Sequence, residues 1–227
     1  MYVFMGAKAD PRGQRIGIMQ KWPSEWYVAT QGQAATYFVE DMRIRALVEK
    51  VYPRAGISKV IVRKNDTTGE VLIFTAKPAA IIWKDGTELA KFEARLKKLT
   101  WAEYKVTIKE VKVPELSAKI MAEFAAIQLE WRTPHRRVAK GIMQKVMEKW
   151  ALGVKIKIGG RLWGTDISRS EHFSEGRIPL QTLRSEVDYH HTTALTKYGI
   201  LWVKVWICKS ENVTISKKQN ALDKIAL

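Results

Sequence analysis

The stretch VIVRKNDTTGEVLIF, residues 60–74, decides the fold of the first half of this chain. Its two ends, residues 60–62 and 71–74, are runs of β-branched, aliphatic and aromatic side chains, which are favoured in strands. Between them, Asn65, Asp66 and Gly69 are of the residue types that form tight turns. The pattern predicts two antiparallel strands joined by a short turn.

Helical patterns lie on both sides of this hairpin. Residues 34–51 are expected to form a helix that stops before Pro53. On the other side, a short apolar run at residues 79–82 leads through a loop to a helix over residues 87–99. That helix repeats apolar side chains at helical spacing on one face: Leu89, Phe92, Leu96 and Leu99.

A strand over residues 105–113 is expected to close the unit. Val106 and Ile108 fall on one face of it, whereas Val111 and Val113 fall on the other, which predicts a bulge between the two pairs. The order helix, strand, strand, short helix, loop, helix, strand is that of a type II KH domain, which we assign to residues 29–113.

The loop between the last two helices is where a KH domain approaches nucleic acid. A G-x-x-G sequence there lets the backbone come close to phosphates, because glycine has no Cβ. Here the loop reads Trp83, Lys84, Asp85, Gly86, so only the last glycine is present. Trp83 adds bulk and Asp85 a negative charge, so we expect this loop to have lost most of its clamp function. The alternative is a tight helix–helix turn with Trp83 packed sideways.

Composition narrows the class of protein. The chain has 39 Lys and Arg against 23 Asp and Glu, a formal net charge of +16, and a hydrophobic fraction of 46% typical of a folded protein. Excess cations on a compact body repel one another unless a polyanion neutralises them, and nucleic acid is the commonest polyanion in cells. A membrane is the weaker alternative, because no stretch approaches the roughly 20 apolar residues of a spanning helix. The single cysteine, Cys208, is typical of a reducing compartment.

The remaining segments are an arm, a second domain and a tail. Residues 1–28 form a basic arm expected to be extended, residues 114–209 the second domain, and residues 210–227 a polar tail. The domain's first helix is expected to carry an apolar stripe of Leu116, Ile120, Phe124, Ile127 and Trp131. Its second helix, capped by Thr133 with Pro134 in the first position, is expected to end at Gly153. The side chains that this helix should bury are Val138, Ile142, Val146 and Trp150.

The rest of the second domain is predicted to be β structure. Val154, Ile156 and Ile158 alternate with two lysines, which indicates a half-buried strand with a basic outer face. Gly159 and Gly160 mark a turn or bulge. A last strand places one set of apolar side chains on a single face: Leu201, Val203, Val205 and Ile207. The fold class is therefore α+β, a type II KH domain followed by an α/β sandwich-like C-terminal domain.

A cluster of cations at the start of the second helix is the strongest local signal. Arg136, Arg137 and Lys140 fall within about a 100° arc, opposite the apolar stripe of that helix. They lie in the first turns, where the helix dipole disfavours positive charge. Phosphate contact explains this placement better than an ordinary charged surface, which remains the alternative.

Further arginines recur after residue 160, at Arg161, Arg169, Arg177 and Arg184, and their planar guanidinium groups suit phosphate. No catalytic pattern accompanies them. The four histidines, His135, His172, His190 and His191, lack the spacing of a zinc site. We therefore predict a protein that is not an enzyme and that needs no metal or cofactor.

Several stretches resemble the bacterial type of ribosomal protein three of the small subunit. The resemblance is carried by Gly159-Gly160-Arg161-Leu162, residues 175–184, Val187-Asp188-Tyr189 and residues 198–207, and it extends back through Val113-Pro114-Glu115-Leu116 to Met5-Gly6-Ala7-Lys8. Almost the whole chain is covered. The sequence departs from the family at the loop of residues 83–86, normally a full G-x-x-G with two lysines, and in a tail that stops soon after the last strand.

The resemblance implies a structural protein of the small-subunit head, near where messenger RNA enters. It implies binding to small-subunit rRNA, with ribosomal proteins ten and fourteen as neighbours. Arg136, Arg137 and Lys140 would contact the messenger, and the arginines after residue 160 would contact rRNA. To the rRNA ligands we add the cations of the arm and of the basic strand: Lys8, Arg12, Arg15, Lys155 and Lys157.

The expected location is a ribosome, in the bacterial cytoplasm or in an organelle, mitochondrion or plastid. The alternative function is a stand-alone KH-type RNA-binding regulator, which would need a working loop. A hydrolase or lyase acting on nucleic acid is a distant third, because no site for it is visible in the sequence.

Overall fold

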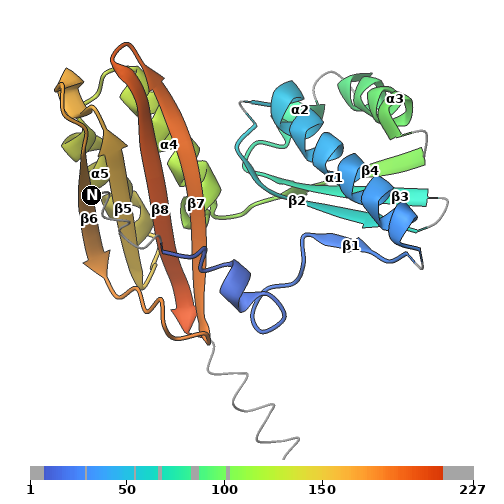
Figure 1. The fold of residues 1–227 in the computed structure, drawn as a ribbon, viewed down its shortest axis with the longest axis horizontal. Coiled ribbons are helices and arrows are strands. Elements are labelled where there is room, and N and C mark those ends of the chain that lie inside the picture. The colour runs from blue at the N-terminus through green and yellow to red at the C-terminus, as the bar shows by residue number, and fades with distance from the viewer. Residues whose placement is uncertain are drawn as a thin grey trace, which may run out of the picture. The chain divides into compact units, whose positions relative to one another are not determined.

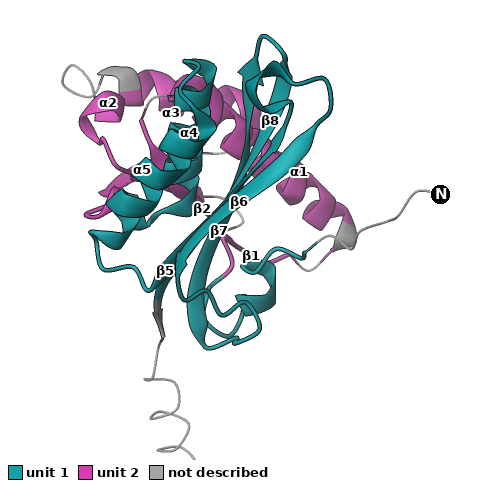
Figure 2. Cartoon of the chain, turned by 90° about the vertical axis from the view of Figure 1, so that its left-hand side faces the viewer, with its two compact units in different colours: residues 1–21, 115–227 teal, residues 22–114 magenta. Residues whose placement is uncertain are grey.

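The computed structural model describes residues 8–28, 30–53, 55–65, 68–82, 87–100 and 103–211. They form two compact units, coloured separately in Figure 2. Unit 1 comprises the described parts of Met1–Lys21 and Glu115–Leu227, and unit 2 is Trp22–Pro114. The segment expected as one arm at residues 1–28 is thus divided between the two units. Within the described part of the chain, no helix is both long and apolar enough to cross a membrane.

Unit 2 is built around the predicted hairpin. Strands β2 (Ile57–Lys64) and β3 (Thr68–Thr75) pair antiparallel, which confirms it, and β4 (Glu103–Glu110) pairs parallel to β3. The helices are α1 (Gln31–Val51), α2 (Ala79–Ile82) and α3 (Thr87–Thr100). This is the expected order of a type II KH domain. A strand that the sequence did not predict, β1 (Ser24–Trp26), lies parallel to β2 and gives the sheet order β1-β2-β3-β4.

The core of unit 2 lies between this sheet and its helices. Alternate strand side chains such as Val62, Val71 and Ile73 meet Ile44 and Val48 of α1 in one hydrophobic cluster. The apolar stripe of α3 joins it through Phe92 and Leu96. Burying such side chains contributes about 1.5–3 kcal/mol each, which holds the helices on the sheet.

The bulge predicted in the last strand of this unit is wrong. Strand β4 pairs with β3 without a register shift from Glu103 to Glu110. The strand ends at Glu110. Val111 and Val113 lie beyond it, so their side chains need not alternate between the two faces of the sheet. The Val111 amide still donates to the carbonyl of Thr75 at 2.8 Å, which completes the pairing at this end.

Unit 1 has two layers. Helices α4 (Ala118–Glu130) and α5 (His135–Met147) lie on one face of a four-stranded sheet, behind it in Figure 1. The strands are β5 (Gly153–Gly160), β6 (Arg169–Gly176), β7 (Ser185–Thr196) and β8 (Gly199–Glu211), in the antiparallel order β6-β5-β8-β7. The predicted alternation holds, because Val154, Ile156 and Ile158 are buried beneath the helices.

The described residues also form three short 3₁₀ helices: η1 (Gly13–Arg15) in the arm, η2 (Pro114–Leu116) before α4, and η3 (Leu162–Gly164) after β5. The expected turn or bulge at Gly159 and Gly160 is not found, since both glycines pair in register with β6 at the end of β5. The tail from residue 212 onwards lies outside the described residues.

The two helices of unit 1 correct several predictions. On α4 the fully buried face is formed mainly by alanines. Of the expected stripe, Leu116, Ile120 and Phe124 are half-buried against the core, whereas Ile127 and Trp131 are exposed, Trp131 at 78%. On α5, Val138, Ile142 and Val146 are buried as predicted, but the helix ends at Met147 and Trp150 is 91% exposed. The helix also begins one residue later than expected. Pro134 is its N-cap, and the cap makes no side-chain hydrogen bond.

Candidate nucleic-acid interface

Helix α5 presents the predicted cationic cluster to solvent. Arg136, Arg137 and Lys140 are all exposed, while Val138 and Ile142 on the opposite side are buried against the sheet. Within the described part of the chain, neither Arg137 nor Lys140 forms an ion pair. The helix therefore holds these two cations outward without neutralising them, which is the arrangement that an anionic ligand requires.

Arg136 differs, because a carboxylate of strand β6 holds it. Its Nε donates to Glu171 Oε2 at 3.3 Å, and His135 Nε2 lies 3.0 Å from the same oxygen. Arg169 reaches the other carboxylate oxygen at 3.5 Å. Hydrogen bonds from His135 and then Arg136 lower the pKa of Glu171 below its ordinary value. Glu171 thus holds two of the predicted RNA-binding arginines, Arg136 in the first turn of α5 and Arg169 on β6.

The structure gives Arg15 a different role from the one expected. Its side chain is fully buried in unit 1, and its guanidinium donates to five backbone carbonyls at 2.7–3.2 Å. The acceptors are those of Pro11, Pro179, Leu180, Thr182 and Ser185. Each of the three guanidinium nitrogens donates at least one of these hydrogen bonds, and burial lowers the pKa of the group. Arg15 therefore holds the arm on the segment before β7 and presents no surface to RNA.

The rest of the described arm carries its cations to the surface of unit 1. Arg12 pairs with Asp10 at 3.1 Å and lies 6.0 Å from the centre of the Tyr189 ring. Lys8 borders a hollow of about 1130 Å³, together with Lys155 of β5 and residues of the 176–183 segment. Burial, followed by the nearby charges of Lys8 and Lys157, lowers the pKa of Lys155. Lys8 and Lys155 thus line the hollow together, and Lys157 lies close enough to Lys155 to affect its charge.

The remaining predicted arginines lie on loops and edges of the same unit. Arg161 pairs with the fully exposed Asp166 at 3.1 Å and donates to the carbonyl of Thr165 at 2.9 Å. Arg177 and Arg184 are exposed at either end of the segment that joins β6 to β7. These arginines are at the surface, but the structure does not gather them into one pocket with the cluster on α5.

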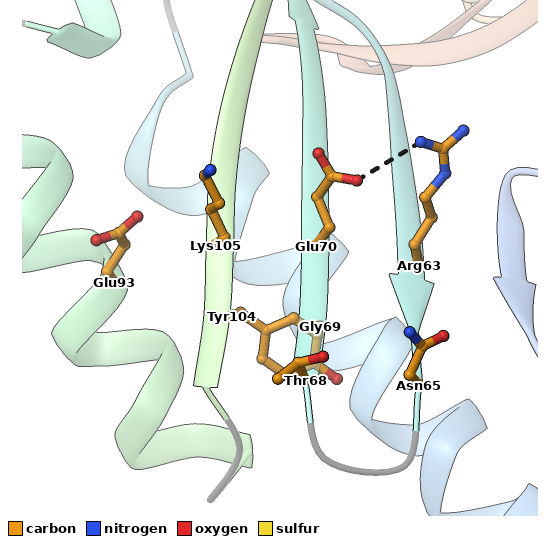
Figure 3. A pocket seen from close by; sticks show the side chains of 8 residues that line it. All are labelled: Arg63, Asn65, Thr68, Gly69, Glu70, Glu93, Tyr104 and Lys105. Carbon is orange, nitrogen blue, oxygen red and sulfur yellow. Dashed lines mark ion pairs between the residues drawn. The ribbon is translucent and has the colours of Figure 1, made fainter.

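On the sheet face of unit 2 that lies away from its helices, positive and negative side chains alternate. Cross-strand pairing places Glu25, Arg63, Glu70 and Lys105 in one row across all four strands. Arg63 contacts Glu25 at 2.7 Å and Glu70 at 3.5 Å, the latter drawn in Figure 3. Acids and bases alternate along this row and neutralise one another.

The row borders a hollow of about 720 Å³ at the end of the sheet, shown in Figure 3. The ring of Tyr104 lies over Gly69 there, and a Cβ at Gly69 would meet it at 2.2 Å. Burial raises the pKa of Tyr104. Glu70 and Glu93 give the hollow a negative lining as well as a positive one, so it is not suited to phosphate.

The KH loop and a possible metal site remain to be considered. The KH loop, Trp83, Lys84, Asp85 and Gly86, lies outside the described residues, and its lost clamp function stays a prediction. Among the residues that are described, no three His, Cys, Asp or Glu side chains group as metal ligands would.

Sequence reasoning also overlooked residues on the helix-free face of the unit 1 sheet. Trp202 and Lys204 of β8 alternate outward, next to Lys157 of β5 and His191 of β7. Their alternation with the buried set Leu201, Val203 and Val205 is visible in the sequence. It becomes a common surface only once the strand order is known.

Comparison with known proteins identifies the family. One family model, described as the ribosomal protein S3 C-terminal domain, matches residues 125–207, and a KH domain model matches residues 43–116. Proteins called small ribosomal subunit protein uS3 are similar over nearly the whole chain. The one from Agathobacter rectalis is 42% identical over 91% of this chain and 94% of its own length.

Other bacterial relatives agree. That of a Sulfurihydrogenibium species is 41% identical over 97% of both chains, and that of Xanthomonas oryzae pv. oryzae is 41% identical over 91% of this chain and 84% of its own. Relatives of this identity over most of both lengths share the fold and the structural, non-enzymatic role of the family. The chain therefore belongs to the bacterial uS3 family of small ribosomal subunit proteins.

Proposed function

We propose that this chain binds small-subunit rRNA as part of the subunit head and lines the path by which messenger RNA enters. The observation that carries the messenger role is the outward set of Arg136, Arg137 and Lys140 on α5, of which the last two have no ion pair within the described chain. A single-stranded messenger offers one phosphate per nucleotide, which cations spaced along a helix can follow.

The rRNA role is assigned to the exposed cations of unit 1. Lys8, Lys155 and Lys157 lie close enough to affect one another electrostatically, and no acid lines their hollow among the described residues. An enclosing polyanion would relieve that repulsion. We add Arg12, Arg161, Arg169, Arg177 and Arg184 to this surface and leave Arg15 out of it.

The neighbours and the location follow from the family. We infer that ribosomal proteins ten and fourteen adjoin unit 1, and that the particle is a bacterial ribosome, because the similar proteins are bacterial. An organelle ribosome is the alternative location. A stand-alone RNA-binding regulator is the alternative function, and it predicts a chain recovered free of small subunits.

The messenger role is tested by Arg136→Ala combined with Arg137→Ala in the full chain. Losing two phosphate contacts lowers the salt slope of binding to single-stranded RNA by roughly 1.4. Small subunits that carry the variant should assemble but translate structured messages more slowly. The matched control removes two exposed cations from α1 of unit 2, Arg43→Ala with Lys50→Ala. An unchanged salt slope with normal translation of structured messages would refute the messenger role, and absence of the chain from small subunits would refute the whole proposal.

A further inference from the structure

The sheet of unit 1 has one face that α4 and α5 leave uncovered, the face toward the viewer in Figure 1. Strand pairing fixes which side chains share it. His172 of β6 lies opposite Lys157 of β5, Lys157 opposite Lys204 of β8, and Lys204 opposite His191 of β7. Directly opposed side chains on one face of a sheet are about 5 Å apart at their Cβ atoms. These four residues, the basic row, therefore cross the whole sheet.

An aromatic platform adjoins the basic row. The ring of Trp202 stacks on that of His191, with centroids 5.4 Å apart and planes 7° from parallel, and Trp202 remains 49% exposed. Its neighbour on β5 is Gly159, so no side chain covers that flank of the indole. A Cβ at Gly159 would meet only Ser170 Cβ, at an ordinary 3.5 Å. Packing therefore does not demand glycine there, and its effect is to leave the indole open.

The acidic side chains of the strands avoid this face, and Asp10 of the arm, which lies near Tyr189, pairs with Arg12. Glu171 and Glu175 of β6 alternate to the helix side, where Glu171 meets His135, and Asp188 of β7 accepts the amide of Ala118 at 2.9 Å. Across the rows from Ser170 to Ser174 and their partners on the other strands, the described face carries no carboxylate. Within the described chain, Lys157 and Lys204 form no ion pair. The equivalent face of unit 2 instead pairs its cations with Glu25 and Glu70.

We propose that the helix-free face of the unit 1 sheet binds an unpaired RNA segment, with one base stacked on Trp202 and the flanking phosphates at Lys157 and Lys204. The proposal rests on the RNA-binding function proposed above and names a site for it. An aromatic ring receives a base only when the face of that base is free, which selects a single-stranded segment over a duplex. His191 supports the indole from the other side and holds it in place.

A protein partner is the competing occupant, since Leu195 and Ile200 are exposed at the end of the same face. The centre of a protein interface is depleted of charge, whereas the centre of this face is the basic row. Two unpaired lysines buried beneath a protein would each cost desolvation without compensation. The charge distribution therefore favours RNA.

The stacking contact is tested on the full chain carrying Arg136→Ala and Arg137→Ala, so that the cluster on α5 does not mask it. The probes are a single-stranded RNA decamer and the same decamer with abasic sugars. Trp202→Leu should weaken binding to the intact decamer by at least about fivefold and leave binding to the abasic one unchanged, because only the intact RNA can stack. Trp202→Phe should restore most of the affinity. Trp150→Leu, which removes a tryptophan outside this face that is 91% exposed, should change neither.

The phosphate contacts have their own measurement. Lys157→Gln with Lys204→Gln should lower the salt slope for both decamers by roughly 1.4. The proposal is overturned if Trp202→Leu leaves the affinity for the intact decamer unchanged or weakens both decamers alike. It is also overturned if these variants bind RNA normally but fail to enter small subunits, which would mark the face as a protein contact. Neither result depends on whether the unmodified chain is found in small subunits, which is the test of the function itself.

Discussion

Arg15 is a buried residue whose hydrogen bonds, here called the hub, join the arm to the segment before β7. A buried guanidinium is tolerated because five carbonyls accept its hydrogen bonds. Arg15→Met keeps the volume but leaves those acceptors unpaired, so we predict that it lowers the free energy of unfolding by about 2–4 kcal/mol. Urea denaturation followed by circular dichroism measures this.

The matched control for Arg15 is Arg12→Met on the same segment. Arg12 is partly exposed, forms an ion pair with Asp10 and lies 6.0 Å from the centre of the Tyr189 ring, so its loss should cost less than about 1 kcal/mol. Arg15→Lys should fall between the two, because an ammonium has three donors and cannot span the same set of carbonyls. Equal effects of Arg12→Met and Arg15→Met would contradict the role assigned to the hub.

Glu171 makes the stability of unit 1 depend on pH. Its pKa is lowered in the folded chain by hydrogen bonds from His135 and Arg136, relative to an ordinary 4.5. A carboxyl with a depressed folded pKa stabilises the protein above its unfolded pKa and loses that contribution as pH falls through the folded value. We predict that Glu171→Gln lowers the urea midpoint at pH 7 and that the difference from the unmodified chain shrinks below about pH 4.5. Glu175→Gln, on the same strand, should show no such convergence.

The environment of a residue could be predicted where it depends on neighbours in the sequence, but not where it depends on contacts with distant parts of the chain. The outward direction of Lys157 and the exposure of Arg137 follow from local alternation and helical phase, so the sequence was sufficient for both. The burial of Arg15 follows from carbonyls far along the chain, at Pro179 and Ser185. The sequence of the arm alone therefore does not predict that Arg15 is buried.

Helix α4 shows how an element can be identified correctly and oriented wrongly. Its large side chains suggested a stripe, and Ile120 and Phe124 of that stripe do pack against the core, but the most deeply buried face is formed mainly by Ala118, Ala122, Ala125 and Ala126. Alanine lets the helix approach the strands closely, and the larger residues then pack around the edges of the contact. Sequence reasoning that ranks faces by size alone therefore misplaces the centre of the buried face of such a helix.

This packing predicts opposite effects of size on the two sides of α4. Ala122→Leu adds volume where the exposed fraction is 0%, so it should lower the free energy of unfolding by about 1–3 kcal/mol. Trp131→Ala removes a far larger side chain from the exposed side and should change stability by less than about 0.5 kcal/mol. Chemical denaturation of both variants decides the orientation, and the reverse ranking would disprove it.

Strands were found where alternation was long enough to read. The buried set of β5 and that of β8 repeat several times, and the hairpin of β2 and β3 is marked by its turn. Strand β1, Ser24–Trp26, is too short to show a period and exists because the edge of β2 accepts it. Tertiary pairing, which the sequence does not display, created that element.

At the scale of the whole molecule, the net charge of +16 should make the free chain respond to salt in two opposite ways. Raising salt from about 50 to about 500 mM shortens the Debye length from roughly 14 Å to roughly 4 Å, which screens repulsion within the chain as well as attraction to RNA. We therefore predict that the Tm of the free chain rises while its affinity for single-stranded RNA falls.

The basic row makes this prediction specific to one surface. Lys157→Gln with Lys204→Gln removes two cations that no described acid neutralises, so this variant should have a higher Tm than the unmodified chain at low salt and a smaller rise with added salt. Arg63→Gln with Lys105→Gln, taken from the alternating row of unit 2, should instead lower the low-salt Tm, because it removes the ion pairs that Glu25 and Glu70 form with Arg63. Differential scanning calorimetry of the unmodified chain and the two double variants, each at low and at high salt, separates the cases. A Tm that falls with salt in the free unmodified chain would mean that its cations are already compensated, and the need for an enclosing polyanion would disappear with it.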